Sequence, residues 1–326
     1  MGRTVIGSLR RWRQSDLGFR LGTGLFALAL VVIVAGIGVE LYRQSALSIR
    51  KFGLSFWHTE IWDPVSGDFG ARPFIWGTLY SSVLALLIAT PVSLGIAIYL
   101  SELCPARLRQ PLSFLTELLA AIPSIVYGLW GIFVLVPLVR QVEAAMPDAL
   151  RALPLFSGPP IGVGMLSAAL ILAVMVTPFT SSIAREVLKA VPVSQREAAY
   201  ALGATRWEAI RAALFYGRVG IVGAVMLGFG RALGETMAVT MVIGNNPQVS
   251  WSLFAPQYTM AAVIANEFTE ASDDLYLSAL VEIGLVLFVI TLAVNAASRL
   301  LIWRMNRRPA ARPAPPGPAR AAQGAA

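Results

Sequence analysis

The sequence has very few of the side chains that build disulfides, metal sites and phosphate-binding lysine loops. Its 326 residues include one cysteine, Cys104, one histidine, His58, and two lysines, Lys51 and Lys189. A single cysteine cannot form an internal disulfide, and a histidine without other ligand types nearby predicts no metal site. Neither lysine follows a glycine, as the lysine of an ATP-binding phosphate loop does. We therefore expect no cofactor, no metal and no ATP bound through such a loop.

Charge is also scarce. Only 13% of the residues are charged and 56% are hydrophobic, with a mean hydropathy of +0.68, whereas roughly a quarter of an ordinary globular chain is charged. This composition excludes a soluble enzyme with a single core. The net charge is +8, but the basic residues form short clusters beside apolar stretches and build no basic face. The charge therefore indicates membrane topology, and no nucleic acid partner is expected.

Six apolar stretches are long enough to cross about 30 Å of hydrocarbon. They are Leu21–Val39, Phe74–Leu100, Leu112–Val139, Ile161–Ala184, Val219–Gly244 and Tyr276–Trp303. We predict an all-α polytopic membrane protein with one six-helix domain at residues 21–306. Residues 1–20 form a basic N-terminal segment, and the Pro/Ala-rich residues 307–326 predict a disordered tail.

Lysine and arginine are concentrated in alternate connections between the predicted spans, which lie on one side of the membrane. Nineteen lie in the N-terminal segment, residues 101–111, residues 185–218 and the stretch from Arg299 onward; six lie in the other connections, and Arg231 lies inside a span. Cytoplasmic loops of membrane proteins carry the excess of Lys and Arg. The split predicts a multi-pass membrane protein with both termini cytoplasmic.

Four ionisable side chains lie within the predicted spans, namely Glu117, Arg231, Glu235 and Glu282. Such residues are costly in a membrane and are functional candidates by default. Glu117 and Glu282 each follow a loop by a few residues. We expect them either to reach the membrane surface or to form structural pairs.

Arg231 lies deeper, about 20 Å into the predicted fifth span and past the bilayer midplane. Glu235 follows it by four residues, so on one helix the two would share a face and can form an ion pair. One interpretation is an anion pathway, in which Arg231 offers a planar fork to phosphate-like oxygens and Glu235 tempers its charge. The alternative is a buried structural pair.

The internal loop 185–218 and the external segment 245–274 each predict a short helix. In the internal loop the helix ends at Gly203 and a second amphipathic stretch follows around Trp207. Its Glu197 and alanines offer a surface that a partner can clasp, although an interfacial helix fits the composition equally well. The external segment is acidic, and its apolar run 260–265 predicts a short helix. A solvated loop and a docking surface remain alternatives for that segment.

The motif Glu197-Ala198-Ala199-x3-Gly203, in a cytoplasmic loop before the penultimate span, resembles the coupling motif of ABC importer permeases. Three further stretches resemble the phosphate permeases, the PstC family; they are Glu117–Gly128, Gly230–Val239 and Ala265–Phe268. The resemblance runs from roughly residue 20 to residue 306. The chain departs from the motif's later Ile-x-Leu-Pro at residues 213–216, so we expect a less sharply turned exit from the coupling region.

The resemblance implies the MetI-like fold of type I ABC importers and a role as a permease subunit of a high-affinity phosphate importer. Its implied partners are a PstA-like sister permease, two copies of a PstB-like ATPase that hydrolyses ATP, and a PstS-like periplasmic phosphate-binding protein. It places Arg231 and Glu235 on the phosphate passage and Glu197, Ala198, Ala199 and Gly203 at the ATPase. Three alternatives remain: a permease for sulfate, molybdate or phosphonate, a membrane enzyme acting on lipid phosphates, and an assembly or sensory protein.

Overall fold

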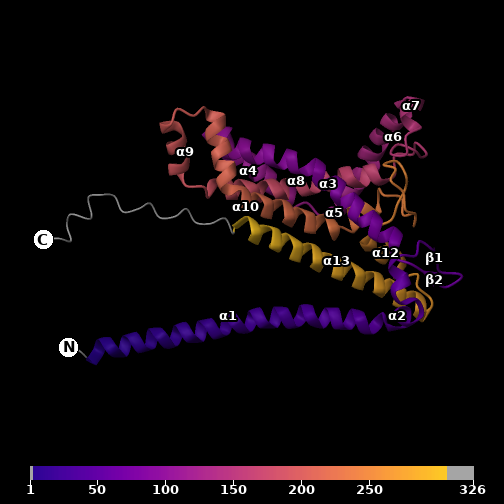
Figure 1. Ribbon diagram of the computed structural model, residues 1–326, viewed down its shortest axis with the longest axis horizontal. Coiled ribbons are helices and arrows are strands. Elements are labelled where there is room, and N and C mark those ends of the chain that lie inside the picture. The colour runs from indigo at the N-terminus through magenta and orange to yellow at the C-terminus, as the bar shows by residue number, and fades with distance from the viewer. Residues whose placement is uncertain (1–2, 307–326) are drawn as a thin grey trace. The chain divides into compact units, whose positions relative to one another are not determined.

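The computed structural model describes residues 3–306, with side chains from Gly18 to Met305. Helices make up most of this part of the chain (Figure 1). The long helices are α1 (Arg3–Gln44), α3 (Arg72–Ile98), α8 (Met165–Lys189), α10 (Arg206–Leu233) and α13 (Asp274–Asn306). The shorter ones are α2 (Ala46–Phe52), α4 (Ala106–Ala120), α5 (Ser124–Trp130), α6 (Val136–Ala145), α7 (Asp148–Arg151), α9 (Val193–Ala201), α11 (Met237–Thr240) and α12 (Met260–Glu267).

The remaining elements are short. A 3-10 turn covers Gly53–Trp57, and π-helical turns cover Tyr99–Leu103 and Gly131–Leu135. The two-residue strands β1 (Trp62–Asp63) and β2 (Asp68–Phe69) pair antiparallel. At the turn of this hairpin the Val65 N–H donates to Asp63 Oδ1 at 2.9 Å, and this hydrogen bond lowers the pKa of the Asp63 carboxyl.

Among the described residues, six helical segments are long and apolar enough to cross a membrane, which confirms the predicted all-α polytopic architecture. They are Gly18–Gln44, Arg72–Leu103, Ser124–Ala145, Met165–Lys189, Arg206–Leu233 and Asp274–Met305. Helix α1 begins at Arg3, so it includes most of the segment predicted as a separate basic N-terminus. The predicted tail at residues 307–326 lies outside the described residues.

The predicted third span, Leu112–Val139, is wrong at its start. Helix α4 ends at Ala120 and α5 begins at Ser124, so the crossing segment starts only at Ser124. Pro123 lies in the break, where it lacks an N–H and disfavours helical backbone at the residue before it. Pro91 and Pro178, by contrast, lie inside the continuous helices α3 and α8.

The predicted fifth span, Val219–Gly244, is wrong at both ends. Helix α10 begins at Arg206, where Thr205 and Glu208 form a capping box, and it ends at Leu233. The two residues exchange hydrogen bonds of 3.4 Å (Glu208 N to Thr205 Oγ1) and 2.7 Å (Thr205 N to Glu208 Oε2). These bonds satisfy backbone N–H groups that a helix start otherwise leaves unpaired. The helix runs unbroken through residues 213–216.

The contacts divide the chain into two compact units, each assembled from three stretches. The first unit comprises the chain up to Ser81, Gly128–Ala168 and Glu235–Ile290. The second comprises Ser82–Tyr127, Ala169–Gly234 and the chain from Thr291 onward. The prediction of one continuous six-helix domain did not anticipate this division.

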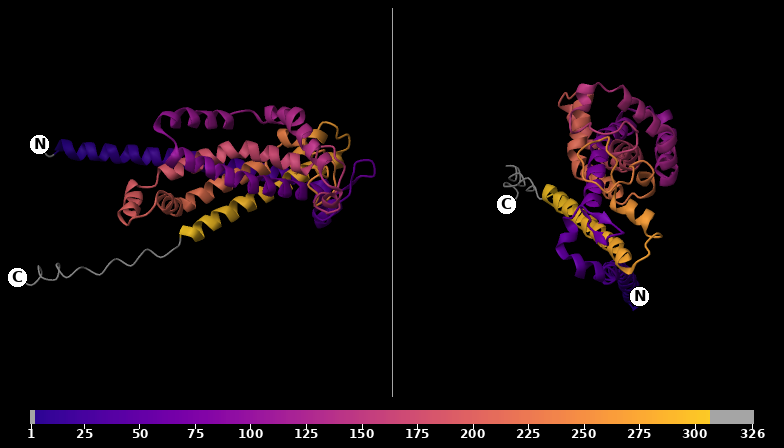
Figure 2. Two further views of the ribbon diagram at one scale, coloured as in Figure 1. Left: turned by 90° about the horizontal axis from the view of Figure 1, so that it is seen from above. Right: turned by 90° about the vertical axis from the view of Figure 1, so that its right-hand side faces the viewer.

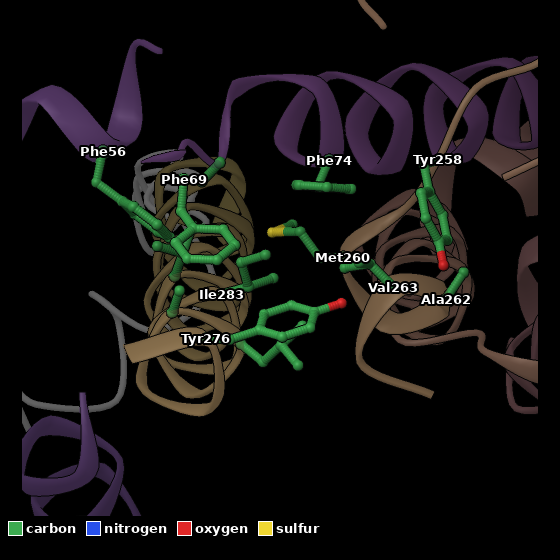
Figure 3. Close-up of a cluster of buried hydrophobic side chains, with 13 residues drawn as sticks. Phe56, Phe69, Phe74, Tyr258, Met260, Ala262, Val263, Tyr276 and Ile283 are labelled. Atoms are coloured by element: carbon green, nitrogen blue, oxygen red, sulfur yellow. The ribbon is translucent and has the colours of Figure 1, made fainter. Parts of the chain in front are cut away.

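The first unit has an aromatic core drawn from the β-hairpin, α3, α12 and α13 (Figure 3). The rings of Trp62 and Phe74 meet edge to face with centroids 4.8 Å apart, and Phe69 stacks on Tyr276 at 5.3 Å. Each such pair contributes about 0.5–1.5 kcal/mol beyond the area it buries. Glu267 Oε2 fixes two of the rings by accepting from Trp62 Nε1 at 2.8 Å and from the Tyr276 hydroxyl at 2.7 Å.

Helix α12 is the short helix predicted from the apolar run at 260–265, and it is buried rather than solvated. Met260, Ala262 and Val263 have no exposed surface. Next to it, burial raises the pKa of the Tyr258 hydroxyl, which accepts from Asn266 Nδ2 at 3.0 Å. The helix therefore forms part of the core of the first unit.

The second unit packs α3, α8 and α10 around small residues. Its core contains Ala97, Ala184, Leu188, Ile221 and Ala224. A side chain at Gly220 of α10 would collide with Val187 of α8, so glycine permits the close approach of these two helices. Helix α9 lies in the connection between α8 and α10 (Figures 1 and 2).

Candidate functional site

Arg231 lies in the last turn of α10, in the second unit. Its guanidinium carbon is 5.3 Å from the ring centroid of Phe179 on α8, which is within cation–π range. Its Nε is buried and has no hydrogen-bond partner among the described residues. A buried donor without a partner costs about 1–3 kcal/mol, so this guanidinium keeps unused hydrogen-bonding capacity.

Two further polar side chains of the second unit lie close to the end of α10. The Thr180 hydroxyl of α8 is buried, without a hydrogen-bond partner in the described chain, and fills the space beside Gly228. Asn295 Oδ1 of α13 would lie 3.8 Å from a β-carbon at Gly230. Sequence reasoning missed Phe179, Thr180 and Asn295. The only available signal for Thr180 and Asn295 was a polar side chain within an apolar span, and Phe179 offered no signal.

The prediction that Arg231 and Glu235 share one helix face is wrong. Helix α10 ends at Leu233, Gly234 forms its C-cap, and Glu235 lies in the connection to α11. Residues four apart share a face only while the helix continues, and here glycine ends it. Within the first unit, Glu235 Oε1 accepts from the Ala238 N–H of α11 at 3.3 Å.

Helix α9 confirms the short helix predicted before Gly203, and one arginine holds it in the second unit. Arg196 binds Glu102 through two nitrogens, at 2.6 and 3.1 Å, and the side chains are only 19% and 12% exposed. The same guanidinium donates to the Val191 and Leu188 carbonyls at 3.0 and 2.9 Å. Arg206 of α10 adds a hydrogen bond to the Glu102 carbonyl at 2.9 Å. The π-helical turn that follows α3 is thereby bonded to α9 through Arg196 and to the start of α10 through Arg206.

The other face of α9 is open. Glu197 and Ala198 are exposed and Ala199 is half-buried. Leu202, which caps the helix, is 90% exposed, and Trp207 at the start of α10 is 61% exposed. Gly203 follows with φ +81°, a conformation that favours glycine. A carboxylate beside exposed apolar side chains is the composition of a docking surface. Sequence reasoning did not single out the exposed Leu202.

The two other carboxylates that the sequence placed within spans differ from each other, and Glu117 lies on α4, before the third crossing segment. Glu117 Oε1 is 3.6 Å from Arg185 Nη2, so it is one of the expected structural pairs. Glu282 is 3% exposed and forms no ion pair within the described chain, so it neither reaches a surface nor pairs with a cation. Its Oε2 has no hydrogen-bond partner in that part of the chain, and Ser48 of α2 lies beside it. Among residues 3–306, no group of three His, Cys, Asp or Glu side chains is placed to hold a metal ion.

Comparison with known proteins finds likeness along most of the chain. Residues 93–307 match the family described as binding-protein-dependent transport system inner membrane component. The chain is 47% identical over 307 residues to a phosphate transport system permease protein PstC from Mesorhizobium japonicum, covering 92% of this chain and 94% of that protein. A PstC from Haemophilus influenzae is 49% identical over 89% of this chain and 93% of that protein.

More distant proteins retain the likeness. A probable phosphate transport system permease protein PstC from Methanocaldococcus jannaschii is 40% identical over 82% of this chain and 88% of its own. Among solved structures, an inward-facing MetNI methionine ABC transporter matches 72% of this chain and 95% of its own, with a TM-score of 0.55 at 16% identity. That structural likeness supports the MetI-like fold.

Proposed function

The chain belongs to the family of binding-protein-dependent transport system inner membrane components, and we propose that it is the permease subunit through which an ABC importer moves inorganic phosphate. The observation that carries this proposal is its identity of 40–49% to phosphate permeases along most of both chains. The six membrane-crossing helices fit the role. Because these relatives are named for phosphate, permeation of sulfate, molybdate or phosphonate is not favoured.

Arg231 is the residue we assign to the phosphate pathway. Arg231 lies in the last turn of a membrane-spanning helix, where a charged side chain is costly unless it faces protein or water. Its Nε is buried without a hydrogen-bond partner in the described chain, and a guanidinium fork matches two oxygens of a phosphate. Asn295 and Thr180 can add hydrogen bonds to a passing anion. Glu235 is proposed for the same passage on the resemblance alone, as a proton acceptor.

The partners of the permease follow from the kind of transport system. We propose a PstA-like sister permease, two copies of a PstB-like ATPase and a PstS-like periplasmic phosphate-binding protein. ATP hydrolysis takes place on the ATPase, because neither lysine of this chain follows a glycine as in an ATP-binding phosphate loop. Closure of the ATPase pair draws the coupling helices together and opens the pathway to the binding protein. The protein lies in the bacterial inner membrane with both termini cytoplasmic.

Helix α9 is the proposed coupling helix. Its exposed Glu197 and Ala198, the half-buried Ala199 and the turn at Gly203 present a surface to the ATPase. The exposed Leu202 supplies an apolar anchor that can fill a pocket on a partner. On the opposite side, the Arg196–Glu102 pair passes the movement of α9 to α3.

Uptake of radiolabelled phosphate tests the substrate and the pathway together. Cells that lack this chain are assayed with the wild-type protein, with Arg231→Gln, and with Arg211→Gln as a control from the exposed part of the same helix. Excess unlabelled phosphate, and not sulfate, molybdate or phosphonate, should block wild-type uptake. Loss of the charged fork should lower uptake about 10- to 100-fold in Arg231→Gln only.

Two results would contradict this assignment. Wild-type rates in an Arg231→Gln importer would show that the arginine is structural. Competition by sulfate or phosphonate as strong as by phosphate would show that the substrate class is broader than proposed.

Reversal of one charge on α9 tests the coupling surface. Glu197→Lys should lower co-purification of the ATPase and abolish phosphate uptake while the protein remains in the membrane, because it places a cation where the partner meets a carboxylate. Gln195→Lys, which adds a cation to the same helix but retains Glu197, serves as the control. An intact complex with undiminished uptake in the Glu197 variant would remove α9 from the ATPase interface.

A further inference from the structure

A cavity of about 370 Å³ lies between α4 and the end of α8 that leads into α9, entirely within the second unit. Small-molecule sites typically measure about 300–1,000 Å³. Six of its eight lining residues are polar or charged; the lining consists of Ala106, Arg109, Gln110, Ser113, Phe114, Glu117, Arg185 and Lys189. Neither the proposed phosphate pathway nor the ATPase surface uses these residues. Arg185 and Glu117 were described above only as a structural ion pair.

Three cations converge on this cavity from two helices. Arg185 and Lys189 lie one turn apart on α8, and Arg109 lies on the first turn of α4. Glu117 is the only carboxylate in the lining, so the lining carries a net charge of +2. Glu186, just outside it, accepts from Arg185 Nη2 at 3.0 Å and from Lys189 Nζ at 3.1 Å. Its carboxylate holds the two α8 cations in place and leaves one positive charge in excess.

That excess charge is best represented by Arg109. Its Nη2 donates to the Cys104 carbonyl at 3.2 Å, and no carboxylate of the described chain lies within ion-pair distance of it. A guanidinium has five N–H donors, so several remain for a ligand. Arg185 is only 7% exposed, and a buried cation beside an open cavity attracts an anion more strongly than a solvated one does.

The backbone of α4 favours the same charge. The helix begins at Ala106, which is a lining residue, so the positive end of the helix dipole lies at one end of the cavity, and the other lining residues follow one side of the helix as far as Glu117. The Gln110 amide adds donors. Ser113 Oγ donates to the Arg109 carbonyl at 2.6 Å, which leaves its oxygen as an acceptor for a protonated phosphate oxygen.

Apolar side chains flank these polar groups. Phe114 lines the cavity and is 62% exposed, and on the same helix Leu115 and Leu118 are 51% and 52% exposed. A phosphate diester with acyl chains would satisfy both the cations and this apolar surface, whereas free phosphate would satisfy the cations alone.

We propose that this cavity binds a phosphate group, carried either by an anionic phospholipid or by inorganic phosphate. Arg109, Arg185 and Lys189 contact its oxygens, and the first turn of α4 faces it. The proposal concerns a site separate from Arg231 and does not depend on which anion the importer transports.

The test uses the complete purified importer with the double variant Arg109→Gln/Lys189→Gln. Arg185 is left unchanged because its ion pair with Glu117 joins α8 to α4. The matched control is Arg107→Gln, which removes a cation of α4 that is exposed and does not line the cavity. Size-exclusion chromatography first establishes that the wild-type, double-variant and control importers are intact.

Two arms separate the sources of the phosphate group. In the first, native mass spectrometry counts phosphatidylglycerol retained after transfer from phosphatidylglycerol vesicles. In the second, lipid-depleted importer binds ³²P-labelled inorganic phosphate in the Arg231→Gln background, so that the pathway residue does not contribute. The double variant should bind one of the two probes at least about tenfold more weakly than Arg107→Gln does.

Weaker binding of phosphatidylglycerol by the double variant identifies a phospholipid headgroup as the ligand. Weaker binding of inorganic phosphate identifies the free ion. Arg109→Lys, which keeps the charge, should retain more binding than Arg109→Gln in the affected arm. Equal binding of both probes by the double variant and by Arg107→Gln would overturn the proposal. Neither arm measures transport, so failure here and failure of the proposed function are distinguishable.

Discussion

Gly228 shows how the absence of one side chain sets the distance between two helices. A β-carbon at this position of α10 would collide with Thr180 and Val176 of α8. Overpacking of this kind typically costs about 1–3 kcal/mol. Gly228→Ala should therefore lower the thermal unfolding midpoint of the purified importer.

Gly230 provides the matched control, because a β-carbon there meets only Asn295 Oδ1 at an ordinary 3.8 Å. Gly230→Ala should leave the midpoint unchanged or raise it slightly, since alanine favours helix over glycine by up to about 1 kcal/mol. Equal midpoints for Gly228→Ala and Gly230→Ala would show that α8 and α10 can separate at no cost.

Single residues stand out in the sequence when their chemistry is unusual for a membrane. Arg231 and Glu282 stand out because charge is costly in an apolar span. Their neighbours could not be predicted, because Phe179 and Ser48 come from distant parts of the chain. The prediction that Glu235 shares a helix face with Arg231 failed for a local reason: α10 ends at Leu233 and Gly234 is its C-cap, so Glu235 lies outside the helix.

At the scale of elements, α9 depends on one ion pair. Loss of the Glu102 carboxylate leaves the mostly buried Arg196 with two carbonyl acceptors and no counter-charge, a change that costs about 1–3 kcal/mol. Glu102→Gln should raise amide hydrogen exchange of Val193–Ala201 about tenfold or more in the purified importer. It should also reduce phosphate uptake, because movement of α9 no longer reaches α3.

The comparison with Arg196→Gln makes this prediction specific. That variant also loses the hydrogen bonds to Leu188 and Val191, so its exchange should rise further than that of Glu102→Gln. The double variant should add little to Arg196→Gln, since both changes remove the same pair. Unchanged exchange in all three would mean that packing alone holds α9.

Predictions of elements succeeded where a local signal was strong. The short helix before Gly203 and the turn at that glycine could be predicted, and the structure places Gly203 at positive φ. The break before α5 was missed because hydropathy stays high from Leu112 to Val139, even though Pro123 lies inside that stretch. The start of α10 was placed too late, since its first turns are polar and lie in the segment interpreted as a loop.

At the scale of the whole molecule, the proposed orientation predicts which positions reagents can reach. Val65 is 97% exposed in the β-hairpin connection, and Arg107 is exposed at the start of α4. Val65→Cys should react with a membrane-impermeant maleimide in intact spheroplasts, and Arg107→Cys only after permeabilisation. The native Cys104, at 3% exposure, should contribute little background. The reverse pattern of labelling would invert the topology.

Six spans could be predicted because hydropathy is a property of contiguous sequence. The two compact units could not, because each combines three separated stretches and the decisive contacts are those between them. The ring contact between Trp62 and Tyr276, for example, joins residues more than two hundred positions apart. Periodicity and composition carry no information about such pairs.

The interleaving of the two units also has a consequence for biosynthesis. The last stretch of the first unit ends at Ile290 and that of the second begins at Thr291, so α13 supplies the closing piece of both. While the ribosome is still making α12, neither unit has its full set of helices, and the aromatic rings of the β-hairpin lack their contact with Tyr276. Neither unit can complete its packing before α13 has been synthesised, so both units are completed at nearly the same stage of synthesis.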